Sequence, residues 1–151
     1  MAIIDYTGIE NEIKTLLLND SRTSSFGGRN TTIDVEGEFI LNENTCPYIA
    51  IFLDSYDTLA DTETIGGAKP YLTRLSIQIW MYDFSLENVP GSTNRDIMLG
   101  KVKEVLKENK TLNNQVLYWK FGPGRFQNKQ NTTGLGFFKG VSLILDCEVK
   151  E

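Results

Sequence analysis

Hydrophobic and polar residues alternate most regularly between Tyr71 and Phe84. From Tyr71 to Met81 the odd-numbered positions are apolar except Thr73, whereas the even-numbered positions mix aromatic, apolar, polar and charged side chains. A period of two predicts a β-strand with one buried face and one mixed face. At roughly 3.3 Å per residue it would span about 45 Å, well beyond a strand of about 5–6 residues. We therefore expect this long strand to organise the domain.

The mixed face of the long strand carries Arg74, Gln78, Trp80 and Tyr82. Aromatic residues and arginine are enriched in protein interfaces. Two interpretations stay open: the face contacts another protein or another copy of the chain, or Trp80 lies beneath a second layer of its own chain.

Apolar residues at helical spacing predict amphipathic helices at about 6–19 and 93–109. Thr7 and Glu10 fit a capping box for the first helix, and Pro90-Gly91 precedes the second. Further strands are expected at about 32–41, 46–55, 115–121 and 137–149. The element order α-β-β-β-α-β-β predicts an α+β fold in a single domain over residues 1–151. We expect a twisted, mostly antiparallel sheet of four to five strands, with both helices on one face.

Two segments lack any periodicity and are predicted to be loops. In the first, residues 20–31, Phe26 either folds back onto the core, which we favour, or docks on a partner. The second, residues 122–136, carries Arg125, Phe126 and Lys129 between glycine-rich ends. Long loops without secondary structure are often functional, so we interpret this one as a docking loop rather than a simple connector.

Composition argues against several functional classes. The 151 residues hold 15 basic and 20 acidic side chains and no histidine, for a net charge of −5. Phosphate binding needs clustered Lys and Arg, and histidine is the commonest general base and metal ligand, so we expect neither a nucleic-acid groove nor an enzyme. The acidic residues Asp54, Asp57, Asp61 and Glu63 could hold a hard cation, but a solvated acidic loop is the favoured interpretation. We predict no catalytic residue, no cofactor and no metal.

Cellular context is indicated by the two cysteines and by hydropathy. Cys46 and Cys147 each lie in an apolar strand-like run, which predicts two buried free thiols in a reducing compartment rather than a disulfide. The first ten residues lack the pattern of a signal peptide, and no apolar run approaches 18 residues, so we expect no membrane association.

Five segments together resemble a known family: the helix near the start, PYIAIFLDS, YLTRLSIQIWMYD, NRDIMLGKVKEVL and GFFKGVSLILDCEV. In the order of its helices and strands and in the character of the strands, the chain is similar to the tail terminator, or tail-completion, proteins of long-tailed bacteriophages. This is the family that includes minor tail protein U. The resemblance covers roughly residues 3–149. It rests on element order, because this family has no sharp catalytic or ligand motif.

The resemblance implies a structural virion protein that closes into a ring, commonly a hexamer, on the head-proximal end of the tail tube. Such a ring stops tube growth, offers a surface to head-completion or neck proteins, and lets the phage DNA pass without sequence-specific binding. The protein would be located in the virion tail and, during assembly, in the host cytoplasm. Two alternatives remain: a head-closure or neck connector protein, and a small ligand-binding α+β domain. Interface residues expected from the chain itself are Arg74, Gln78, Trp80, Tyr82, Arg125, Phe126 and Lys129.

Overall fold

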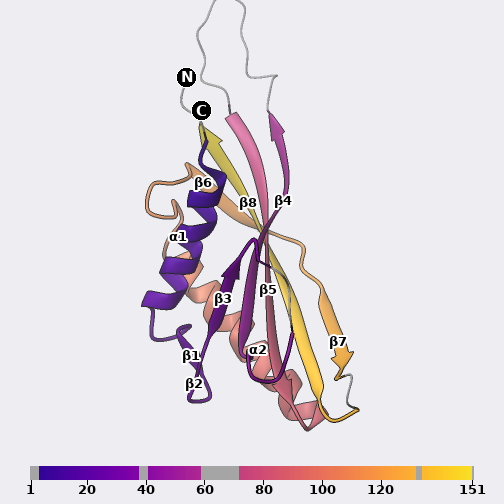
Figure 1. Ribbon diagram of the computed structural model, residues 1–151. Coiled ribbons are helices and arrows are strands. Elements are labelled where there is room, and N and C mark those ends of the chain that lie inside the picture. Colours follow the sequence, from indigo (N-terminus) through magenta and orange to yellow (C-terminus); the bar gives the residue numbers. More distant parts are fainter. Residues whose placement is uncertain (1–3, 38–40, 59–71, 132–133, 151) are drawn as a thin grey trace, which may run out of the picture.

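Two long strands pair at the centre of the structure, a computed structural model that describes residues 4–37, 41–58, 72–131 and 134–150. They are β5 (Leu72–Ser85) and β8 (Phe137–Lys150), each 14 residues long. The two run antiparallel along their whole length, from the Leu72–Lys150 pair to the Ser85–Phe137 pair (Figure 1). The long strands predicted at 71–84 and 137–149 are therefore confirmed.

The main sheet has the order β3-β4-β5-β8-β6, and β7 also pairs with β8. Its other strands are β3 (Thr32–Val35), β4 (Tyr48–Thr58), β6 (Tyr118–Gly122) and β7 (Phe126–Gln130), and a separate hairpin joins β1 (Ser25–Phe26) to β2 (Arg29–Asn30). Every pairing in the main sheet is antiparallel except that of β3 with β4. The α+β fold in a single domain is confirmed, but the expected four to five strands are too few.

Both helices, α1 (Tyr6–Asn19) and α2 (Asn88–Lys107), lie on the same face of the sheet, as predicted (Figure 1). α1 packs on β3 and β4, whereas α2 packs on β5 and β8. The core between helices and sheet is built from fully buried apolar side chains: Ile9, Ile13, Leu17, Met98, Val102, Ile77, Ile79, Met81, Leu145 and Cys147. Odd-numbered residues of β5 and β8 thus form the helix-covered face, and even-numbered residues form the mixed face.

The N-cap of α1 and the first residue of α2 differ from those predicted. The Asp5 carboxylate caps α1 by accepting a hydrogen bond from the Gly8 N–H at 3.0 Å, so the capping box of Thr7 and Glu10 is wrong. The α2 helix begins at Asn88, five residues before the prediction. Pro90 lies inside its first turn, where a backbone N–H has no partner within the helix and proline is tolerated.

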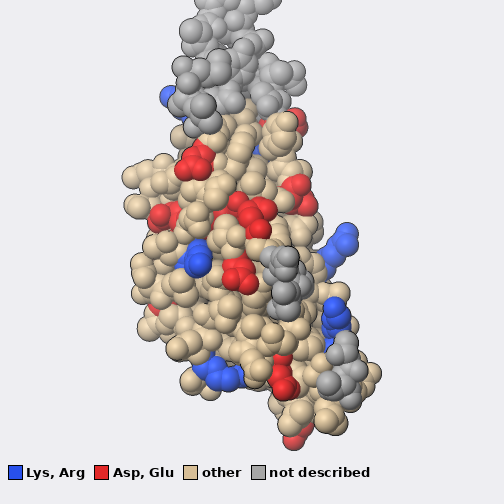
Figure 2. Space-filling view, in the orientation of Figure 1, with Lys and Arg blue, Asp and Glu red and all other residues tan. Residues whose placement is uncertain are grey.

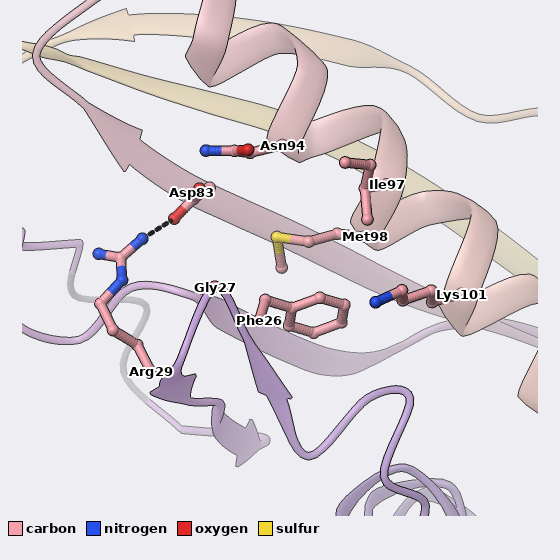
Figure 3. Close-up of a pocket in the computed structure, with 8 residues that line it drawn as sticks. All are labelled: Phe26, Gly27, Arg29, Asp83, Asn94, Ile97, Met98 and Lys101. Carbon is pink, nitrogen blue, oxygen red and sulfur yellow. Dashed lines mark hydrogen bonds and ion pairs between the residues drawn. The ribbon is translucent and has the colours of Figure 1, made fainter.

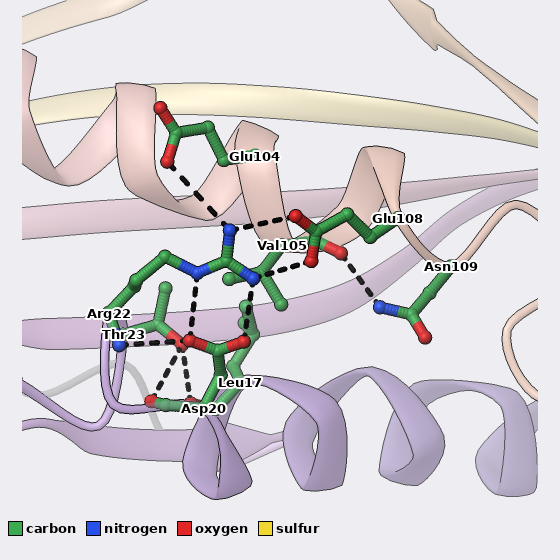
Figure 4. Close-up of polar contacts among 8 residues, drawn as sticks. All are labelled: Leu17, Asp20, Arg22, Thr23, Glu104, Val105, Glu108 and Asn109. Carbon is green, nitrogen blue, oxygen red and sulfur yellow. Dashed lines mark hydrogen bonds and ion pairs between the residues drawn. The ribbon is translucent and has the colours of Figure 1, made fainter.

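An ion-pair cluster joins the C-terminal ends of the two helices (Figure 4). The Arg22 guanidinium, in the loop after α1, contacts Asp20 at 2.8 Å and donates a second hydrogen bond to Glu108 at 2.9 Å. Its Nη1 also lies 3.9 Å from Glu104 on α2. These hydrogen bonds lower the pKa of Asp20 to about 2 and also lower the pKa of Glu108. The cluster fixes the loop after α1 against the end of α2.

The short strands β6 and β7 lie one after the other along the same edge of β8 (Figure 1). At the break between them, the Ser142 N–H donates to the Arg125 carbonyl at 2.7 Å, and the Arg125 N–H donates to Ser142 Oγ at 2.8 Å. The prediction of an unstructured loop over 122–136 is therefore wrong for Phe126–Gln130. All five residues of β7 are exposed, so burial imposes no hydrophobic period on them.

Three smaller expectations concern single side chains. Phe26 packs on the main core and is 9% exposed, as favoured above. Cys46 and Cys147 are buried free thiols, and desolvation raises the pKa of each to about 12.

Among the described residues, neither helix combines the length and the apolar character that crossing a bilayer requires.

Candidate functional site on the mixed face of the sheet

The mixed face is partly covered by its own chain around Tyr82. The ring of Tyr82 lies over Gly140 on β8, where an added Cβ would come within 2.3 Å of it. The Tyr82 hydroxyl therefore reaches across β8 and donates a hydrogen bond to Gln127 Oε1 on β7. Burial raises the pKa of Tyr82 to about 12, so the hydroxyl stays protonated as a donor at neutral pH.

Trp80 stacks beside Tyr82, with ring centroids 5.8 Å apart and planes 20° from parallel. Its indole Nε1–H donates to the side-chain oxygen of Gln78 at 3.0 Å, and the Gln78 amide donates to Asp54 at 2.8 Å. This chain of hydrogen bonds fixes the indole plane and satisfies its N–H. The Trp80 ring is only half-buried, so part of its apolar surface remains available.

Two hollows flank Trp80 and share Gln78 and Trp80 in their walls. The first, of about 310 Å³, is lined by Phe52, Gln78, Trp80, Tyr82 and Gln127. The second, of about 440 Å³, is lined by Asp54, Gln78, Trp80, Pro123, Gly124, Arg125, Ser142 and Ile144. We call these two hollows together the Trp80 groove. Its aromatic floor lies beside one guanidinium and one carboxylate, a composition that suits a protein segment with an apolar anchor.

Four of the seven predicted interface residues meet in the Trp80 groove: Gln78, Trp80, Tyr82 and Arg125. Arg74 lies farther along the mixed face, where the register places Asp57 and Glu148 on either side of it. Lys129 lies on β7 opposite Phe138 and does not line the groove. Phe126 is 66% exposed and contacts α2, because the Arg95 guanidinium sits 4.7 Å from its ring centre.

The sequence did not identify Phe52 and Gln127 as groove residues. Both are placed there by strand register, because Phe52 pairs with Gln78 and Gln127 pairs with Gly140. A glycine within the alternating run of the last strand was a signal for a close approach at that position. The sequence alone could not identify Tyr82 as the residue that makes this approach, because the pairing of Tyr82 with Gly140 depends on the register of β5 with β8.

The two edges of the main sheet carry charges of opposite sign. Residues 118–131, which contain β6 and β7, include Lys120, Arg125 and Lys129 and no acidic residue. Residues 32–36 at the β3 edge include Asp34 and Glu36 and no basic residue. Figure 2 shows basic side chains standing out along the β7 margin, while acidic side chains gather over β3 and the adjoining part of the sheet.

A separate pocket of about 220 Å³ lies between the β1–β2 hairpin and α2 (Figure 3). Arg29 Nη2 lies 2.9 Å from the carboxylate of Asp83, whose side chain is only 4% exposed. Lys101 Nζ lies 5.8 Å from the centre of the Phe26 ring. The buried charge in this pocket is thus neutralised by the protein itself, and the ion pair holds the hairpin against β5.

The acidic residues considered for a cation do not form a cluster that the structure can describe. Asp54 bonds to Gln78, whereas Asp61 and Glu63 lie outside the described residues. Within the described ranges, no three Asp, Glu, Cys or His side chains are grouped to hold a metal ion. Compared with known proteins, the sequence matches no model of a protein family and no curated protein.

Proposed function

We propose that this chain is a structural subunit of a bacteriophage tail, a tail terminator that assembles into a ring on the head-proximal end of the tail tube. The proposal starts from the resemblance in element order and strand character. It is supported by the α+β fold, in which both long strands lie at the centre of one sheet.

The Trp80 groove is the observation that carries the proposal. Helices cover one face of the sheet, whereas the groove leaves an indole, a guanidinium and amide groups accessible on the other. Rigid aromatic and arginine side chains are the usual centres of binding energy in interfaces. A subunit that must bind a tube or a neighbouring subunit needs such a surface, and we assign that role to the groove.

The test is co-sedimentation of the purified chain with tubes polymerised from the tail-tube protein of the same phage, alongside its mass in solution. We expect the wild type to pellet with tubes or to form a closed oligomer. Trp80→Ala should weaken this binding roughly tenfold or more, as loss of a central aromatic anchor does. Tyr56→Ala is the matched control, because Tyr56 is an exposed aromatic residue of β4 outside the groove.

Other outcomes separate the alternatives. Binding to a portal or neck protein without binding to tubes would identify a head-closure protein. A wild-type protein that stays monomeric and binds neither partner would contradict the structural role. The groove would then be examined as a pocket for a small ligand.

A further inference from the structure

β7 offers an exposed strand edge along one margin of the main sheet. β7 pairs with β8 on one side only, and all five of its residues are exposed. It contains no proline, and Lys129 is its single charged residue. Edge strands usually carry proline or several charged residues, which prevent pairing with another chain. β7 has no proline and only one charge, so it is poorly protected against strand addition.

Two backbone hydrogen bonds fix which backbone groups of β7 face outward. The Arg125 carbonyl accepts from Ser142 at one end, and the Asn131 N–H donates to the Gly136 carbonyl at the other. Antiparallel pairing alternates, so Gln127 and Lys129 also direct their backbone groups toward β8. Asn128, between them, directs its N–H and C=O away from β8.

The β3 strand forms the opposite edge of the sheet. Thr32 N–H donates to the Pro47 carbonyl and Glu36 N–H to the Ile51 carbonyl, each at 3.0 Å. In a parallel pair the intervening residues Ile33 and Val35 therefore direct their N–H groups away from β4. This edge of four residues is close in length to β7, and its charge is opposite.

We propose that the β7 edge of one copy pairs with the β3 edge of the next copy, so that the sheet continues from subunit to subunit. Arg125 and Lys129 would then face Asp34 and Glu36 of the next copy. Because the two edges differ, the contact is head-to-tail, and repeated contacts of this kind close into a ring if the rotation allows. The inference rests on the proposed function, since it supplies the contact through which the ring would form.

Chemical cross-linking distinguishes head-to-tail from symmetric contact. Thr32→Cys and Asn128→Cys place a thiol on each edge and keep its charged residues, while Cys46 and Cys147 are buried and protonated and should not react. With a short bismaleimide, the double variant should give a ladder of covalent oligomers. Each single variant should give none, whereas covalent dimers of Asn128→Cys alone would show β7 paired with β7 and overturn the proposal.

Two further variants test the backbone and the charge separately. Asn128→Pro removes an outward N–H and leaves the hydrogen bonds to β8 in place, so it should weaken self-association roughly tenfold without lowering the melting temperature of the subunit. Lys129→Glu should weaken self-association by a similar factor, because it reverses the charge of the β7 edge. Lys107→Glu is the control and should leave self-association unchanged, because Lys107 is an exposed lysine on α2.

The wild-type measurements keep the two proposals apart. If the wild type forms oligomers or binds tubes but the double variant gives no ladder, the edge contact is wrong and the proposed function stands. If Asn128→Pro and Lys129→Glu assemble like the wild type, the edge contact is equally excluded. If the wild type neither self-associates nor binds tubes, both proposals fail together.

Discussion

The two tryptophans lie on opposite faces of one sheet and have different environments. Trp119 on β6 is fully buried on the helix-covered face, edge-on to Phe121, and its Nε1–H donates to the Asn109 carbonyl at 2.9 Å. Trp80 on β5 is half-buried on the mixed face and bonds to the side chain of Gln78. Both indoles have a hydrogen-bond partner, but only Trp119 is enclosed on all sides.

The comparison shows that strand alternation alone does not determine burial. The same period of two places residues on both faces of β5 and β8, and the helices decide which face becomes core. On the mixed face, the described part of the chain covers only one end, with Cys46, Tyr48 and Phe138 around Tyr82. The remaining surface can serve binding without loss of the core, and this separation of roles can be tested by mutation.

The largest effect is expected on the helix-covered face. Trp119→Ala should lower the free energy of unfolding by about 3–5 kcal/mol, because it leaves a large cavity and an unpaired Asn109 carbonyl. Urea unfolding followed by circular dichroism measures this loss. Trp119→Phe is the control that keeps most of the packing, and a loss under about 1 kcal/mol for Trp119→Ala would break the comparison.

A smaller effect, dependent on pH, is expected at Glu10, a fully buried residue of α1. Neither carboxylate oxygen has a hydrogen-bond partner among the described residues. Burial, and then the neighbouring Glu36 carboxyl, raise the pKa of Glu10 to about 8. The folded state therefore holds a proton that the unfolded chain releases near its usual pKa of about 4.3.

The sign follows from that raised pKa. Glu10 contributes fully to the free energy of unfolding below about pH 4.3, where it is protonated in both the folded and the unfolded state. This contribution is lost as the pH rises toward 8, where Glu10 ionises in the folded protein as well. Glu10→Gln should remove this loss and gain on the order of 2 kcal/mol at pH 8 relative to the wild type, allowing for solvent screening. Melting temperatures between pH 5 and 8 measure it; parallel curves for the two proteins would contradict a buried neutral Glu10.

On the mixed face, Trp80→Ala should lower the free energy of unfolding by only about 1–2 kcal/mol. The stacking with Tyr82 and part of the buried area are lost, but no enclosed cavity forms. Urea unfolding beside Trp119→Ala gives the direct contrast. If the two alanine variants lose equal stability, the mixed face is ordinary core and the groove is not a binding surface.

The smallest effect is expected for Arg22→Gln at the helix ends. Glu104 and Glu108 are exposed and Arg22 is partly exposed, and ion pairs of this kind contribute little. We expect a slight drop in melting temperature at low salt that disappears near 1 M salt, where charges are screened within about 3 Å. Lys107→Gln serves as the control for removing a nearby cation, and a drop independent of salt would indicate a packing role for Arg22.

The sequence predicted those elements in which burial imposes a period. The strands at 71–84 and 137–149 and the helix at 6–19 agree with the structure because one side of each is enclosed. β7 was missed because exposed polar residues carry no such period, and its strand geometry comes from pairing with β8. The parallel pairing of β3 with β4 was missed because an alternating pattern is the same for parallel and antiparallel strands.

The site was predicted in part for the same reason. Gln78, Trp80 and Tyr82 share a face of one strand, so their proximity follows from sequence spacing. Arg125 joins them only because the break between β6 and β7 lies beside Ser142. Phe126, predicted with them, contacts Arg95 instead, since successive residues of a strand point to opposite faces.

The position of β8 in the sheet also constrains how the chain folds. β8 follows all other described elements in sequence, yet it lies between β5 and both β6 and β7. During synthesis, β5 can pair with β4 but waits for its second partner, some 65 residues away, and β6 and β7 have no strand to pair with until β8 leaves the ribosome. Contacts so distant in sequence slow folding and leave open strand edges in the nascent chain. The edge of β5 that receives β8 stays open until then, which makes completion of β8 the step that separates folding from premature association.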